Sequence, residues 1–146
     1  MAKRILVPLD ASERSEAVLP LVADLARGAG STVRLLHVAP LGRTRISDAG
    51  RVLVYAHHLE ERRESEGLDR LRDVEHLLEG VAVERRVRFG ETVTEILNEA
   101  EAFEADLIAL SASRRPWWRR AAGRIAAQVR AKSSVPVLIL AEGGAR

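Results

Sequence analysis

The stretch Lys3-Arg-Ile-Leu-Val-Pro-Leu9, which ends at Asp10, is the part of the sequence that decides the fold class. It is short and aliphatic, and an apolar run of this length predicts a strand that is buried on both faces of a parallel sheet. Between Val18 and Ala26 the apolar residues recur at helical spacing, which predicts a helix after the strand. Pro20 lies inside that pattern and should kink the helix or loosen a turn. A strand followed by a helix is the first part of a βαβ unit.

The same alternation continues along the chain. Further strands are predicted at residues 31–38, 81–89, 106–111 and 134–140. Further helices are predicted at about 53–78, at 92–103 and around 125–131. Five strands that alternate with four helices predict an α/β fold, an open five-stranded parallel sheet with helices on both faces. No linker is visible, and we expect residues 1–146 to form one domain.

The composition excludes several classes of protein. The 146 residues contain no cysteine, which excludes a disulfide framework, a Cys-ligated zinc site and a cysteine nucleophile. The longest apolar run, Val135–Ala141, is much shorter than the ~20 residues that a membrane-spanning helix needs. No nucleophile beside a base, no pair of carboxylates and no set of metal ligands is visible. We therefore expect a cytoplasmic protein that is not an enzyme and holds no metal.

The fold class also predicts where a ligand would bind. In an open parallel sheet, ligands bind beyond the carboxyl ends of the strands, where the strand order reverses. This rule selects the segments that follow the first, second and fourth predicted strands, which are residues 8–12, 38–40 and 111–124.

The order of several short motifs along the chain resembles that of the universal stress protein family. The motifs are Ile5-Leu-Val-Pro-Leu-Asp-Ala-Ser12, Glu16-Ala-Val-Leu-Pro20, Leu35-Leu-His-Val38, Gly90 before a helix, Ala105-Asp-Leu-Ile-Ala-Leu110 and Ser134-Val-Pro-Val-Leu-Ile-Leu140. The resemblance covers nearly the whole chain. It implies the strand order 3-2-1-4-5, a homodimer that is often built around the last strand, and a role in stress survival. It also implies that some members bind ATP while others do not.

In the members that bind ATP, a glycine motif follows the fourth strand: Gly, two residues, Gly, nine residues, Gly, then Ser or Thr. Glycines let backbone N–H groups approach the phosphates beside the start of a helix. When this chain is aligned to that motif, the first glycine is Ser111 and the second is Arg114. Gly123 matches the third if the loop is one residue shorter, and Arg124 stands at the hydroxyl position. The resemblance therefore implies a degenerate phosphate loop.

The residues that the resemblance assigns to the nucleoside are better retained. Asp10, which follows Pro8 and Leu9, stands where the acidic residue of the family meets the nucleoside. Val38 stands where an apolar side chain lines the adenine pocket. Asp10 has a second candidate role, because its spacing to Glu13 fits a capping box at the start of the first helix. The sequence leaves both roles open.

The segment after the fourth predicted strand is basic and contains both tryptophans. Between Leu107 and Ala141 there are seven cations and no acidic residue, although the formal net charge of the whole chain is only +2. Five interpretations are open: a solvated loop, phosphate binding by arginines, nucleic acid binding with stacked tryptophans, contact with an anionic membrane surface, and a protein contact. The residues concerned are Arg114, Arg115, Trp117, Trp118, Arg119, Arg120 and Arg124.

Three functional hypotheses follow. We expect a universal-stress-like homodimer with weak or absent ATP binding, which acts through protein contacts made by Trp117, Trp118, Arg119 and Arg120. One alternative is an adenine-nucleotide-binding sensor in which the Arg-rich loop replaces the glycine phosphate loop. Another is an anion- or nucleic-acid-binding module that uses the same loop, with nucleic acid as the less favoured partner.

Overall fold

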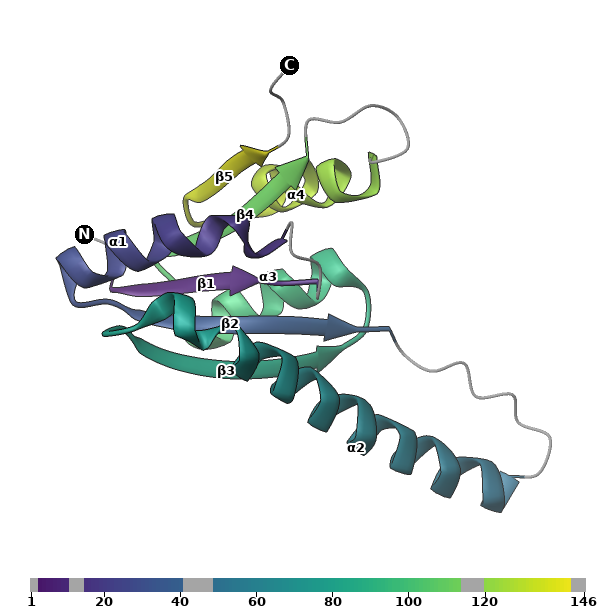
Figure 1. Cartoon of the computed structure of the whole chain (residues 1–146). Helices are drawn as coiled ribbons and strands as arrows, with labels where there is room; N and C mark the ends of the chain where they lie inside the picture. Colours follow the sequence, from purple (N-terminus) through teal and green to yellow (C-terminus); the bar gives the residue numbers. More distant parts are fainter. Residues whose placement is uncertain (1–2, 11–14, 41–48, 114–119, 143–146) are drawn as a thin grey trace.

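A computed structural model describes residues 3–10, 15–40, 49–113 and 120–142. Its centre is a five-stranded sheet in which every neighbouring pair is parallel (Figure 1). The strands are β1 (Arg4–Pro8), β2 (Thr32–Ala39), β3 (Ala82–Phe89), β4 (Leu107–Ser113) and β5 (Val137–Glu142). Their order in the sheet is β3-β2-β1-β4-β5. The predicted fold class and strand order are therefore confirmed.

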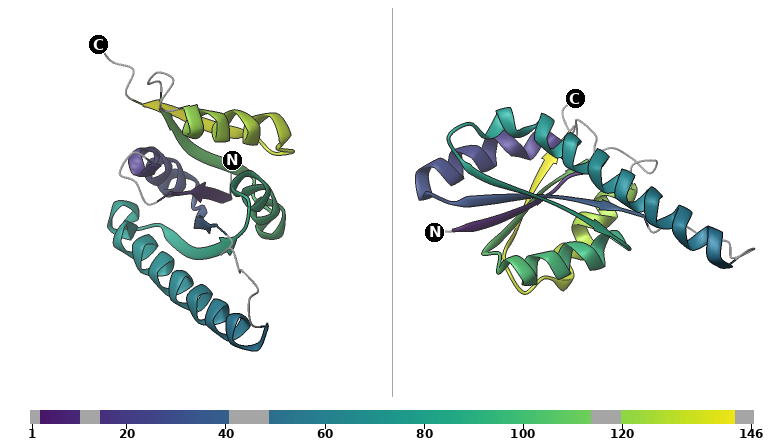
Figure 2. Two further views of the ribbon diagram at one scale, coloured as in Figure 1. Left: turned by 90° about the vertical axis from the view of Figure 1, so that its right-hand side faces the viewer. Right: turned by 90° about the horizontal axis from the view of Figure 1, so that it is seen from below.

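Helices cover both faces of the sheet. They are α1 (Leu19–Ala29), α2 (Ala49–Asp73), α3 (Thr92–Phe103) and α4 (Arg120–Lys132), with short 3₁₀ helices η1 (Ser15–Val18) and η2 (Glu75–Leu78). Figure 2 shows α1 and α2 on one side of the sheet and α3 and α4 on the other. Within the described ranges, no helix combines the length and the apolar character needed to cross a membrane.

Strand β1 contributes to both halves of the core. Ile5 and Val7 pack into the cluster beneath α1 and α2, while Leu6 packs into the cluster beneath α3 and α4. All three are at most 1% exposed. The unbroken apolar run of β1 has this physical cause: side chains alternate between faces, and both faces are covered.

Helix α2 approaches the sheet closely at Gly67. A Cβ atom at this position would lie 2.9 Å from Cγ2 of Val87 and 3.1 Å from Cδ2 of His37. Because real Cβ atoms do not come this close to neighbours, the missing side chain is what lets the helix pack against β2 and β3 at this point. Towards its N-terminus α2 extends past the carboxyl edge of the sheet (Figure 1).

Two predictions about the first helix are wrong. Helix α1 begins at Leu19, so Pro20 lies in its first turn, where proline costs no hydrogen bond and produces no kink. The N-cap of α1 is Val18, without a side-chain cap, so Asp10 does not cap this helix. The capping-box prediction also involved Glu13, which lies outside the described residues.

Two predicted boundaries differ from the observed ones. The long helix starts at Ala49 rather than near residue 53, and it ends at Asp73 with η2 after it. Strand β5 starts at Val137, because Pro136 has no N–H and contributes only its carbonyl, which accepts a bond from the Ile108 N–H at 3.0 Å.

Candidate functional site

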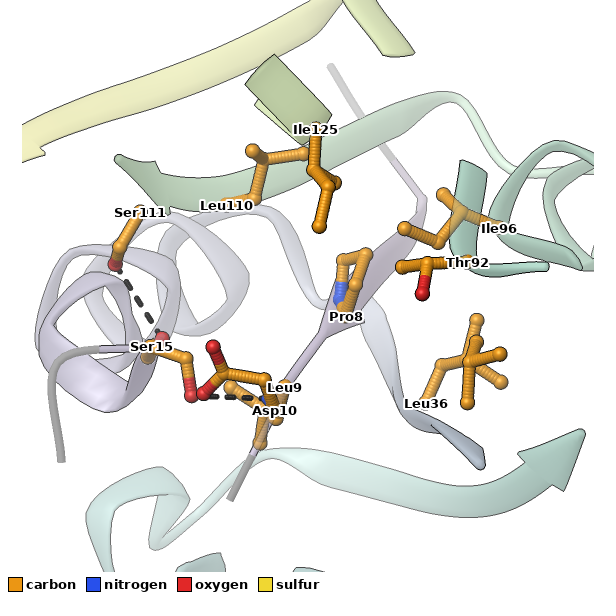
Figure 3. A pocket seen from close by; sticks show the side chains of 11 residues that line it. Pro8, Leu9, Asp10, Ser15, Leu36, Thr92, Ile96, Leu110, Ser111 and Ile125 are labelled. Atoms are coloured by element: carbon orange, nitrogen blue, oxygen red, sulfur yellow. Dashed lines mark hydrogen bonds between the residues drawn. The ribbon is translucent and has the colours of Figure 1, made fainter. Parts of the chain in front are cut away.

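A cavity opens at the carboxyl edge of the sheet, between β1 and β4, where the strand order reverses (Figure 3). Its volume is about 130 Å³. Pockets for whole small molecules commonly measure roughly 300–1,000 Å³. The cavity therefore fits one part of a ligand, such as a base, rather than an entire nucleotide. It is lined by Pro8, Leu9, Asp10, Ser15, Leu36, Val38, Thr92, Ile96, Leu110, Ser111 and Ile125.

The end of β1 is held in place by three groups. The Leu9 N–H donates to the Leu36 carbonyl at 2.8 Å, which continues the pairing of β1 with β2. The Asp10 N–H donates to Ser15 Oγ at 3.1 Å. On the other face of the sheet, Nδ1 of His37 lies 3.4 Å from the Leu9 carbonyl oxygen. The backbone that presents Asp10 is thus tied to both β2 and η1.

The end of β4 is tied to η1 as well. The Ser111 hydroxyl donates to the Ser15 carbonyl at 3.3 Å. Figure 3 shows both bonds of Ser15, one towards Asp10 and one towards Ser111.

The lining of the cavity is apolar at its base and polar at its rim. Leu36, Ile96 and Leu110 are buried, and they form an aliphatic floor. The Asp10 side chain is exposed at the rim. An ionised carboxylate accepts hydrogen bonds but donates none, so Asp10 suits a hydroxyl or amino group of a ligand. The arrangement can enclose a flat apolar group and hold one polar edge of it.

The structure brings together most of the predicted site residues. Pro8, Leu9, Asp10, Val38 and Ser111 all line this one cavity. Their role in binding stays a prediction, but their proximity follows from the parallel sheet, which places the ends of β1, β2 and β4 at one edge.

The described residues that the resemblance aligns with the glycine phosphate motif do not form a loop of the predicted kind. Helix α4 begins at Arg120, so Gly123 is inside its first turn rather than in a loop before it. Arg124 is exposed on the same helix, next to Ile125 in the cavity wall. Arg114 lies outside the described residues, as do Arg115, Trp117, Trp118 and Arg119, and only the backbone of Arg120 is described.

Sequence reasoning missed the wall that α3 contributes. Thr92 and Ile96 line the cavity from the first turns of this helix. The sequence did contain a signal for this wall. Thr92 lies two residues after Gly90, which follows β3 directly, and the carboxyl ends of all parallel strands lie at the same edge of the sheet. Ser15 was also missed, since its role depends on how η1 folds back over the ends of two strands.

A second polar cluster lies under α3, away from the cavity. Glu99 is fully buried; its Oε2 accepts from Arg34 Nη1 at 2.5 Å, and its Oε1 accepts from Arg88 Nε at 2.6 Å. Arg86 Nε lies 3.6 Å from the same Oε1, and the Arg34 guanidinium stacks 4.1 Å above the Phe103 ring. We call this set of five residues the Glu99 cluster.

The charges of the Glu99 cluster stabilise one another. Burial acts to raise the pKa of Glu99, but the hydrogen bonds from Arg88 and Arg34 outweigh it and lower that pKa below its ordinary value. The bond to Glu99 raises the pKa of Arg88. Glu84 and Glu95 complete the charge balance through Arg34 and Arg88. Together with Glu84 and Glu95, the cluster pairs three strand arginines with three acids, which is a structural arrangement.

Metal ligation has no support in the part of the chain that the structure describes. No group of three or more histidine, cysteine, aspartate or glutamate side chains there is placed to hold a metal ion.

Comparison with known proteins agrees with the architecture. The chain is 25% identical to the hypothetical protein MJ0577, with a TM-score of 0.75 and 98% of each chain covered. It is 17% identical to a universal stress protein in complex with cAMP, with a TM-score of 0.63, 97% of this chain and 98% of that chain. It is 24% identical to the universal stress protein from Archaeoglobus fulgidus in complex with dAMP, with a TM-score of 0.59, 93% of this chain and 95% of that chain.

No curated protein matches the chain. The sequence model of the universal stress protein family, in contrast, matches residues 1–141. This match includes β1 to β4, all of β5 except its last residue, and the whole lining of the cavity. The chain belongs to the universal stress protein family.

Proposed function

We propose that this chain is a homodimeric stress-response protein that works through protein contacts and binds adenine nucleotides only weakly, by their nucleoside end. The observation that carries the proposal is the cavity at the carboxyl edge, which holds Asp10 and Val38 together over an aliphatic floor. Two universal stress proteins of the same fold form complexes with cAMP and dAMP, which supports an adenine nucleotide as the ligand class.

Weak binding follows from the phosphate side. Ser111 stands where the ATP-binding members have the first glycine, and Gly123 lies within α4. The side chain of Ser111 keeps backbone N–H groups at the first of these positions away from phosphates, and such groups supply much of the affinity for the phosphates. We therefore expect the phosphates to add little to the affinity of the nucleoside.

The site favours binding over catalysis. The hydroxyl of Ser111 donates to a backbone carbonyl, and the hydroxyl of Ser15 accepts from a backbone N–H. These bonds assign both side chains to holding the ends of β1 and β4. A non-enzymatic role and a cytoplasmic location remain predictions of the sequence.

The dimer proposal rests on the family resemblance and on β5. This strand is at one edge of the sheet, so one side of its backbone has no neighbour among the strands that the structure describes. Its aliphatic residues Val137, Leu138, Ile139 and Leu140 are all only partly buried. Light scattering coupled to size exclusion tests the proposal: we expect twice the 16.1 kDa chain mass, and a single-chain mass would contradict it.

Calorimetric titration with ATP tests the binding proposal. We expect a dissociation constant well above the micromolar range. Micromolar binding would contradict the proposal and favour the nucleotide sensor, in which arginines grip the phosphates. One observation supports that alternative: Arg124 is exposed beside Ile125 in the cavity wall. Micromolar binding that is lost in Arg124→Ala would establish the sensor.

The anion- or nucleic-acid-binding alternative depends on residues 114–119, which lie outside the described residues, and it stays a prediction. Retention on single-stranded DNA at low salt, with a steep loss as salt rises, would support it.

A further inference from the structure

Strands β1 and β4 separate as they approach the cavity. Their pairing comprises Ile5 with Leu107 and Leu6 with Ile108, although β1 continues to Pro8 and β4 to Ser113. N–H groups along a strand point alternately to its two neighbours, and the Leu9 N–H points to β2. The N–H of residue 8 would therefore point to β4, but Pro8 has none. The ladder ends at this proline, and the cavity opens beyond it.

Ser15 connects the two strand ends after their ladder has stopped. Its Oγ accepts from the Asp10 N–H at 3.1 Å, and its carbonyl accepts from the Ser111 hydroxyl at 3.3 Å (Figure 3). Ser15 itself belongs to η1, which leads into α1. Ser15 thus fixes the position of Asp10 relative to β4 and to the helix layer.

Asp10 depends on this connection for its direction. It lies two residues beyond the end of β1, and its side chain is exposed. Its backbone N–H is directed to Ser15, whereas the N–H of Leu9 continues the sheet. Without the Ser15 hydroxyl, the Asp10 N–H would lose this partner, and the backbone would hold the carboxylate less firmly at the rim of the cavity.

We infer that Ser15 is a positioning residue for nucleoside binding, which acts by orienting Asp10 at the rim of the cavity. The inference rests on the proposed function, because it concerns the same site and the same ligand class. Ser15 need not touch the ligand itself. Its effect on binding should therefore require Asp10.

The test measures adenosine affinity by calorimetry for the wild type, Ser15→Ala and Ser15→Thr. We expect about fivefold weaker binding in Ser15→Ala, which is the usual magnitude for one lost hydrogen bond. Ser15→Thr keeps a hydroxyl and should restore affinity to within about twofold of the wild type. Ser133→Ala is the matched control: this hydroxyl bonds the backbone of Val135 away from the cavity, so its loss should leave adenosine affinity unchanged.

A double-mutant cycle separates positioning from a general structural effect. If Ser15 acts through Asp10, then Ser15→Ala should cause no further loss of affinity when Asp10→Ala is already present. A fivefold loss in both backgrounds would overturn the inference, and so would a Ser15→Thr variant as weak as Ser15→Ala. Thermal unfolding of each variant identifies any loss of affinity that arises from unfolding.

The outcomes also separate this inference from the proposed function. If the wild type binds adenosine and Ser15→Ala binds it equally well, the inference fails and the proposed function stands. If the wild type binds no adenosine at millimolar concentration, the proposed function fails, and the role of Ser15 fails with it.

Discussion

Helix α3 contributes to two polar regions whose central carboxylates differ in exposure, because Glu99 is buried and Asp10 is exposed. Thr92 and Ile96 line the cavity, while Glu95 and Glu99 enter the ion pairs with strand arginines. In the Glu99 cluster the charges are paired with one another, and Glu99 is fully buried. At the cavity, the Asp10 carboxylate is exposed above an apolar floor.

The difference shows what a shifted pKa means in this protein. The pKa of Glu99 is lowered by its own arginine partners, which already satisfy it and hold it beneath α3. Such networks stabilise a fold and shift pKa values without being sites of chemistry. At the cavity, in contrast, the Asp10 side chain is exposed at the rim. The following predictions separate the two regions, because changes in one should leave the measured property of the other intact.

The largest effect is expected from Glu99→Gln. This change removes the negative charge and leaves Arg34 and Arg88 without their shared buried counter-charge. Arg34 and Arg88 keep Glu84 and Glu95 as partners, so the cost is that of lost hydrogen bonds to a charged group, and we expect the free energy of unfolding to fall by about 2–3 kcal/mol. Denaturant titration measures it. Glu101→Gln is the control, because Glu101 is exposed on the same helix and should change stability by less than about 0.5 kcal/mol.

The pH dependence of stability should come second in size. The pKa of Glu99 is lower in the folded chain than its ordinary value of 4.5. A lowered folded pKa contributes stability that is complete above the unfolded value and is lost as pH falls towards the folded value. We expect the unfolding free energy to decrease below about pH 4.5. Glu99→Gln should show a shallower decrease in the same range, and equal slopes for both proteins would contradict the assignment.

Filling the cavity should weaken adenosine binding strongly, without the loss of unfolding free energy that we expect for Glu99→Gln. Val38 is partly buried in the cavity wall. The indole of Val38→Trp would occupy much of a cavity of about 130 Å³, so we expect adenosine affinity to fall at least about twentyfold, which converts to roughly 1.8 kcal/mol. Leu25→Trp places the same ring on the exposed surface of α1 and should not change the affinity.

Removing the rim carboxylate should have a smaller effect. Asp10→Ala takes away the acceptor that we assign to a hydroxyl or amino group of the nucleoside. A hydrogen bond to a charged group is worth about 1.5–3 kcal/mol, and exposure of Asp10 places the expected loss near tenfold in adenosine affinity. Asp24→Ala, on the exposed side of α1, is the matched control. Equal affinities for Asp10→Ala and Asp24→Ala would remove Asp10 from the site.

The sequence was sufficient for the parts of this account that depend on local patterns. The apolar run of β1 predicted a strand buried on both faces, and Ile5, Leu6 and Val7 are buried as expected. Asp10 and Val38 were identified through the family resemblance, and they do line one cavity.

Features that depend on tertiary packing were not predictable in the same way. The bond from Ser111 to Ser15 joins residues 96 positions apart, and no local pattern specifies it. The Glu99 cluster left a trace in the sequence, because Glu99 interrupts the apolar stripe that contains Ile96, Ala100 and Phe103. Its partners, however, come from β2 and β3, which only the fold brings beneath α3.

One series of titrations compares nucleoside recognition with phosphate recognition most directly. It uses adenosine, AMP and ATP as ligands under identical conditions. We expect weak binding of all three, with dissociation constants within about threefold of one another, because the nucleoside end carries the affinity. Binding of ATP more than a hundredfold tighter than adenosine would contradict it, since that difference is about 2.7 kcal/mol of phosphate recognition.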